Sequence, residues 1–148
     1  NLGIMGKQRW MAPEIVMGKN DPDKNSDRFS LAVVLFRLLF INHPLEGRYS
    51  TPPCMTKEAE QKYYGSAPIF VYDPSTTENR PIPGTDHNLK LFWNVYPDYV
   101  KEAFIRAFSH DVMMKQKPRI LEKEWLDIFI RLRTEIGRCP HCDMNPKS

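Results

Sequence analysis

The chain has 148 residues, of which 41% are hydrophobic and 26% charged, a composition typical of one soluble globular domain. Its 21 basic and 18 acidic residues give a net charge of +3 and are spread along the chain, which argues against a protein that binds nucleic acid or membranes. Three cysteines, an odd number, argue against a disulfide framework and favour a reducing, cytoplasmic environment.

The chain starts with Asn-Leu-Gly rather than with methionine and shows no signal-peptide pattern, so we expect a piece of a longer protein. The first helix is predicted at residues 13–17, because Pro13 suits the first turn of a helix, where a missing N–H costs nothing. Gly18 can end this helix, and the polar residues after it predict a loop.

The strongest helical pattern runs from Phe29 to Ile41, where only Ser30 and Arg37 interrupt the apolar residues. A helix that is apolar on nearly every side is expected to be buried on nearly every side. We therefore predict that it is the central helix of the fold, because the run is long for a buried strand and too short to span a bilayer. The residues that can cap it are Asn25, Ser26 and Asp27.

A long proline-rich connection follows, since eight of the 13 prolines fall between Pro44 and Pro97. Within it, residues 56–64 predict a short solvated helix and residues 69–72 a brief extended segment. Two amphipathic helices are predicted after it, one starting at 97–98 and one over about 121–136. The sequence therefore predicts an all-α domain of about five helices around a buried central helix.

Several motifs resemble the C-terminal lobe of a protein kinase. Residues 6–14, GKQRWMAPE, match the end of a kinase activation segment, whose pattern is GTxxYxAPE, and residues 26–31, SDRFSL, match the start of the hydrophobic F helix. A bacterial subgroup has an HPLEG turn, a YGxxPxFxxDP segment and a closing Cys-x-x-Cys, which resemble residues 43–47, 64–74 and 139–142. Further matches in the same order are Trp93, Pro97, Arg119, Glu124 and Trp125.

The chain thus resembles part of a bacterial Ser/Thr protein kinase of the eukaryotic type, and the resemblance covers nearly all of it. It implies that residues 1–138 form part of a kinase C-lobe and that residues 139–148 begin a zinc module or a linker. It also implies that Gly6, Lys7 and Trp10 lie on the loop that faces the substrate. Lys7 departs from the family threonine; altered activity or specificity, a shifted alignment and a solvated terminal lysine all remain open.

The resemblance also implies an ion pair. Glu14 lies at a helix start, and burial of its carboxylate requires a cation. In the kinase fold the corresponding glutamate pairs with an arginine near the last helices, and Arg119 is the expected partner, with two parallel hydrogen bonds. The alternative is that both residues are solvated and do not meet. Asp27 corresponds to the F-helix aspartate that binds the catalytic-loop backbone, or else is a plain helix cap.

Cys139 and Cys142 have the spacing of half a zinc site. A complete site needs further ligands, and six residues follow Cys142, so a redox-active dithiol and inert surface cysteines remain as alternatives. The histidines His43, His87 and His110 show no mutual spacing typical of metal ligands, and we interpret them as ordinary polar residues.

The sequence motifs for phosphoryl transfer, namely a glycine-rich loop, His-Arg-Asp and Asp-Phe-Gly, are missing from this chain. We therefore expect that this piece binds no cofactor and supplies the substrate-docking half of a kinase that uses ATP and Mg²⁺. The alternatives are a pseudokinase or interaction scaffold, and an unrelated all-α binding domain. The expected partners are a protein substrate, the rest of the kinase domain and, through exposed apolar surface, a second copy.

Overall fold

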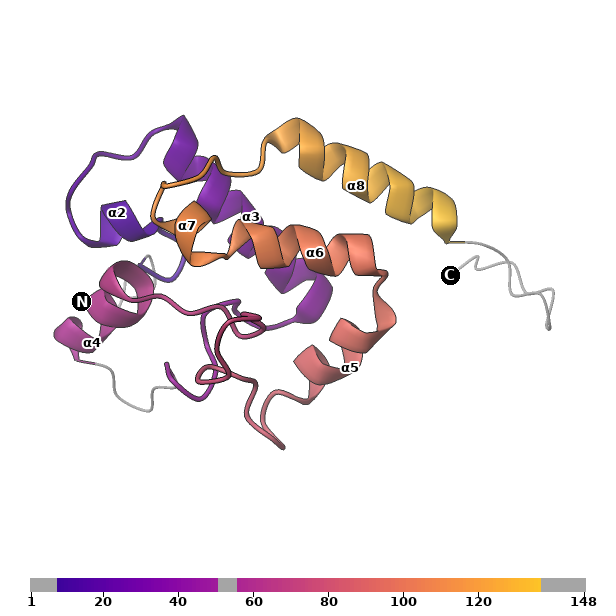
Figure 1. The fold of residues 1–148 in the computed structure, drawn as a ribbon, viewed down its shortest axis with the longest axis horizontal. Coiled ribbons are helices and arrows are strands. Elements are labelled where there is room, and N and C mark those ends of the chain that lie inside the picture. The colour runs from indigo at the N-terminus through magenta and orange to yellow at the C-terminus, as the bar shows by residue number, and fades with distance from the viewer. Residues whose placement is uncertain (1–7, 51–55, 137–148) are drawn as a thin grey trace.

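The computed structural model describes residues 8–50 and 56–136, and within these ranges it contains seven α-helices, one π-helical turn and no strand (Figure 1). The prediction of an all-α protein is therefore confirmed for the described residues, with more helices than the five expected. The elements are α2 (Pro13–Val16), α3 (Lys24–Phe40), α4 (Lys57–Gln61), the π-helical turn η1 (Lys62–Ser66), α5 (His87–Val95), α6 (Asp98–Ala107), α7 (His110–Met113) and α8 (Glu122–Glu135). Within those ranges, no helix combines the length and apolar character that a membrane span requires.

The central helix, α3, starts earlier than predicted because its cap is Asp23 and not one of the three residues from Asn25 to Asp27. The carboxylate of Asp23 accepts a hydrogen bond from the N–H of Ser26 (2.7 Å), and the N–H of Asp23 donates to the Ser26 hydroxyl (2.8 Å). This reciprocal capping box satisfies two free N–H groups at the helix start. Asp27 lies in the first turn, and its side chain is exposed.

The core is built around the aromatic face of α3. Phe36 is completely buried, and its ring lies between 4.5 and 6.0 Å from the rings of Phe40, Phe70, Phe104 and Phe108. Aromatic pairs of this kind add about 0.5–1.5 kcal/mol each beyond the burial of their area. They join α3 to α6 and to the proline-rich connection, and Figure 1 shows α3 crossing behind α6.

The prediction that α3 is buried on nearly every side is wrong for this chain. Val34 is 41% exposed, Leu38 71% and Ile41, directly after the helix, 57%. Their spacing of three and four residues places them on one helix face. The other face carries the buried residues Phe29, Ala32, Val33, Phe36 and Phe40. The helix is therefore half buried, with an apolar outer face.

The helices predicted around residues 13–17, 98 and 121–136 are present as α2, α6 and α8, and α4 with η1 takes the place of the one predicted at 56–64. Two further helices were not predicted. The helix α5 lies inside the proline-rich connection and packs on α3 through Leu89, which is completely buried. The helix α7 has only four residues, too few for a periodic pattern.

The rest of the proline-rich connection is held by side chains instead of by regular backbone pairing. The amide nitrogen of Asn79, which is 1% exposed, donates to the backbone oxygens of Leu45 (2.9 Å) and Ile69 (2.6 Å). Its amide oxygen accepts from the N–H of Tyr49 (3.0 Å). Buried backbone groups need partners, and Asn79 supplies them to two other stretches of irregular chain, residues 45–49 and Ile69.

Candidate functional site

The structure brings Glu14 and Arg119 together in a buried ion pair. Both oxygens of the Glu14 carboxylate accept hydrogen bonds from Arg119, at 2.7 Å each, across 105 residues of sequence. Glu14 is 8% and Arg119 5% exposed. Burial alone would raise the pKa of Glu14, but the hydrogen bonds from Arg119 outweigh it and hold this pKa below its ordinary value.

Arg119 also fastens two further elements. The same guanidinium donates to the backbone oxygen of Asn25 in α3 (3.0 Å) and to that of Met113 in α7 (2.9 Å). One side chain from the loop before α8 therefore joins α2, α3 and α7. A planar guanidinium suits this role because its donors point in fixed directions.

An open, mostly apolar pocket of about 360 Å³ lies between the start of α3, α2 and the residues before α2. Trp10 and Asp27 both line it, so two of the predicted site residues share one cavity. The exposed carboxylate of Asp27 gives this apolar pocket a hydrogen-bond acceptor. The lining residues are Trp10, Met11, Ala12, Ile15, Pro22, Ser26, Asp27 and Ser30.

The segment that leads into α2 is fixed by side chains of α3 and of the turn after it. The hydroxyl of Ser30 donates to the backbone oxygen of Trp10 (2.6 Å). His43 Nδ1 accepts from the N–H of Leu45 (3.1 Å), so the ring proton sits on Nε2 and is donated to the backbone oxygen of Arg9 (2.6 Å). Burial lowers the pKa of His43 to about 4, which keeps the ring neutral.

A second cluster of charged groups surrounds Glu46, and the sequence interpretation missed it. Arg9 grips the Glu46 carboxylate with two hydrogen bonds, at 2.6 and 2.8 Å, and the hydroxyl of Tyr64 donates to the same carboxylate at 2.7 Å. Burial alone would raise the pKa of Glu46, yet the surrounding groups hold it below its ordinary value. Burial and the bond to Glu46 together raise the pKa of Tyr64.

The cluster was missed for a physical reason: its members come from irregular segments and a π-helical turn, where no periodicity marks a side chain as facing another. The HPLEG match placed His43 and Glu46 in one turn, which was the available signal. His43 is thus not an ordinary polar residue, because it is 2% exposed and fixes the backbone ahead of α2.

Four of the predicted site residues, Gly6, Lys7, Cys139 and Cys142, lie outside the described residues. Their roles as a substrate-facing loop and as zinc ligands stay predictions. In the part of the chain that the structure describes, no group of three or more His, Cys, Asp or Glu residues lies close enough together to hold a metal ion.

The described site therefore consists of a buried ion pair, an apolar pocket beside Asp27 and a firmly held Arg9–Trp10 segment. Comparisons with protein-family models, with curated proteins and with solved structures each find no match for this chain.

Proposed function

We propose that this chain is the substrate-docking and structural half of the C-lobe of a Ser/Thr-type protein kinase, and that the longer protein transfers phosphate from ATP with Mg²⁺. The observation that carries the proposal is the bidentate Glu14–Arg119 pair. The sequence resemblance couples these two positions, and a chance match of motifs gives no reason for residues 105 apart to meet in the interior. The pair therefore supports the resemblance over an unrelated all-α domain.

A second observation points the same way. The apolar outer face of α3, formed by Val34, Leu38 and Ile41, is exposed, and the pocket beside Asp27 is open. In a kinase domain the catalytic loop and earlier helices would cover both. Large exposed apolar surface on a helix of the core favours a chain that packs against further protein.

The test is a phosphate-transfer assay on the longer protein that would contain this chain. We expect Asp27→Asn to lower kcat by roughly 10²-fold, because misplacement of catalytic groups by about 1 Å costs that much. Asp21→Asn is the matched control, since Asp21 is an exposed acid in the loop before α3. The 148-residue chain alone is expected to show no turnover.

Turnover by the isolated chain, or equal losses in the two variants, would contradict the proposal. The alternative is a pseudokinase or interaction scaffold, which the exposed apolar residues of α8, Leu126 (58%) and Ile130 (52%), favour as sites for partners. A scaffold would bind partners while the longer protein shows no transfer of phosphate.

A further inference from the structure

Trp10 lies along one face of α3, held at both ends. Ser30 donates to its backbone oxygen at 2.6 Å, and the guanidinium carbon of Arg37 lies 5.0 Å from the centre of a Trp10 ring. Ser30 and Arg37 are seven residues apart, so both lie on the same side of the helix. The Arg37 guanidinium therefore lies over the indole of a residue whose backbone is hydrogen-bonded to the same helix.

Two guanidinium groups flank this tryptophan, but only one is neutralised. Arg9 forms its ion pair with Glu46. Across residues 8–50 and 56–136, no carboxylate lies within ion-pair distance of Arg37. Arg9 and Arg37 both lie near His43, whose ring is edge-on to Trp10 at 6.5 Å. Burial lowers the pKa of His43, the Glu46 carboxylate opposes that effect, and the charges of Arg9 and Arg37 add to it. Among the described residues, Arg37 is thus the positive charge beside Trp10 that no carboxylate neutralises.

The nearby carboxylates of Glu46 and Asp27 do not neutralise Arg37. The Glu46 carboxylate already accepts from Arg9 and Tyr64. Asp27 lies on α3 ten residues before Arg37, about 15 Å away along the helix axis. An anion at the Arg37 end of Trp10 would therefore not meet the carboxylate that lines the pocket at the other end.

We propose that Arg37, lying over the ring of Trp10, binds an acidic side chain of the protein that docks on this surface. The cation–π contact with Trp10 restrains the guanidinium, and its N–H groups can still grip a carboxylate in bidentate fashion. This inference rests on the proposed function in one respect, which is that the docked protein is called a substrate. The substrate that fits the Arg37 site is an acidic peptide.

The test uses the whole chain and a fluorescein-labelled 12-residue peptide of alternating Glu, Ser and Ala, with fluorescence anisotropy as the readout. A peptide with Gln in place of Glu is the probe control. We expect Arg37→Gln to weaken binding of the acidic peptide roughly tenfold, the scale of one charge-assisted bidentate contact. Arg37→Lys, which keeps the charge but loses the planar fork, should weaken it less.

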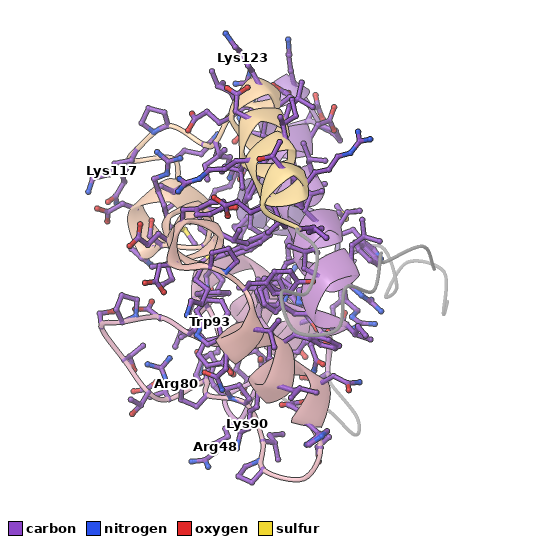
Figure 2. All side chains as sticks on the ribbon, turned by 90° about the vertical axis from the view of Figure 1, so that its right-hand side faces the viewer. Arg48, Arg80, Lys90, Trp93, Lys117 and Lys123 are labelled. Atoms are coloured by element: carbon purple, nitrogen blue, oxygen red, sulfur yellow. The ribbon has the colours of Figure 1, made fainter. Side chains whose placement is uncertain are left out.

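Arg48→Gln is the matched control, because it removes the same charge from an exposed arginine whose side chain projects into solvent at the lower edge of Figure 2. It should change the affinity less than about twofold. Equal weakening in Arg37→Gln and Arg48→Gln would mean attraction to net charge alone and would overturn the inference. So would equal binding of the Gln peptide, or no binding of the acidic one.

A 5-fluorotryptophan NMR spectrum locates the contact, since the peptide should shift the Trp10 signal and leave those of Trp93 and Trp125 in place. The proposed function is tested separately by the phosphate-transfer assay. If the longer protein transfers no phosphate while the Arg37-dependent binding persists, the kinase proposal fails and the acidic-peptide site stands.

Discussion

At the scale of single residues, Glu14 and Arg119 form a buried, bidentate ion pair between distant parts of the chain. Breaking a buried pair by removing one partner leaves an uncompensated charge, which costs far more than the loss of a solvated pair. Arg119 would be that charge, because it is 5% exposed and its remaining hydrogen bonds go to neutral carbonyl groups.

Glu14→Gln is therefore expected to lower the free energy of unfolding by about 3–5 kcal/mol. The matched control is Glu124→Gln, which breaks an exposed pair with Arg106 (2.6 Å) and should cost about 1 kcal/mol or less. Urea denaturation of both variants at pH 7 measures the difference. Similar losses in the two variants would show that burial of the pair makes no contribution.

The same pair has a predictable pH dependence. Because folding lowers the pKa of Glu14 below its ordinary value of 4.5, its stabilising effect is complete above pH 4.5 and is lost as the pH falls through the folded-state pKa. The stability gap between the wild type and Glu14→Gln should therefore narrow in acid.

At the scale of elements, the turn after α3 fixes the segment before α2 through His43. This histidine is 2% exposed, donates to the Arg9 backbone and has a pKa lowered by burial from 6.5 to about 4. Between pH 6.5 and about pH 4, His43 therefore binds a proton in the unfolded chain but not in the folded one. The contribution of neutral His43 to the stability of the fold is complete above pH 6.5 and falls as the pH drops toward 4.

We expect the free energy of unfolding to fall by about 2 kcal/mol between pH 7.5 and pH 5, from the two pKa values of His43. His43→Gln should be less stable at pH 7.5 and nearly flat over this range. His87→Gln, at an exposed position, should keep the slope of the wild type. If the free energy of unfolding of His43→Gln still falls between pH 7.5 and pH 5, groups other than His43 cause the pH dependence.

At the scale of the whole molecule, many large apolar side chains of the described residues are exposed to solvent. The exposed large apolar residues lie on or next to α3, α5 and α8: Val34, Leu38, Ile41, Leu91, Val95, Leu121, Leu126, Ile130 and Ile136. Of the 14 residues of α8, only Trp125 is buried. Such surface tends to find a partner.

We therefore expect the chain to self-associate, with a light-scattering mass that rises with concentration. Leu38→Glu should lower that mass, because it places a charge at the most exposed of these side chains (71%). Gln116→Glu adds the same charge at an exposed polar position and should leave the mass unchanged. A wild type that stays monomeric at high concentration contradicts the expectation.

The parts of the fold that could be predicted are those with a local signal. Proline at a first helical turn and apolar residues at spacings of three and four marked α2, α6 and α8. The contact of Glu14 with Arg119 could be expected because both lie in motifs that resemble those of a family in which such a pair forms. The Arg9–Glu46–Tyr64 cluster and the capping role of Asp23 could not, because they depend on how irregular segments meet in space.

The amide of Asn79 gives the molecule a chemical weak point. Its nitrogen donates to the backbone oxygens of Leu45 and Ile69 in a place that is 1% exposed. Hydrolysis of this amide to a carboxylate would turn two attractive contacts into repulsions between oxygen atoms and would bury a charge. Deamidation of Asn79 would therefore destabilise the proline-rich connection. The burial of Asn79 and its hydrogen bonds hold the side chain in place in the folded protein.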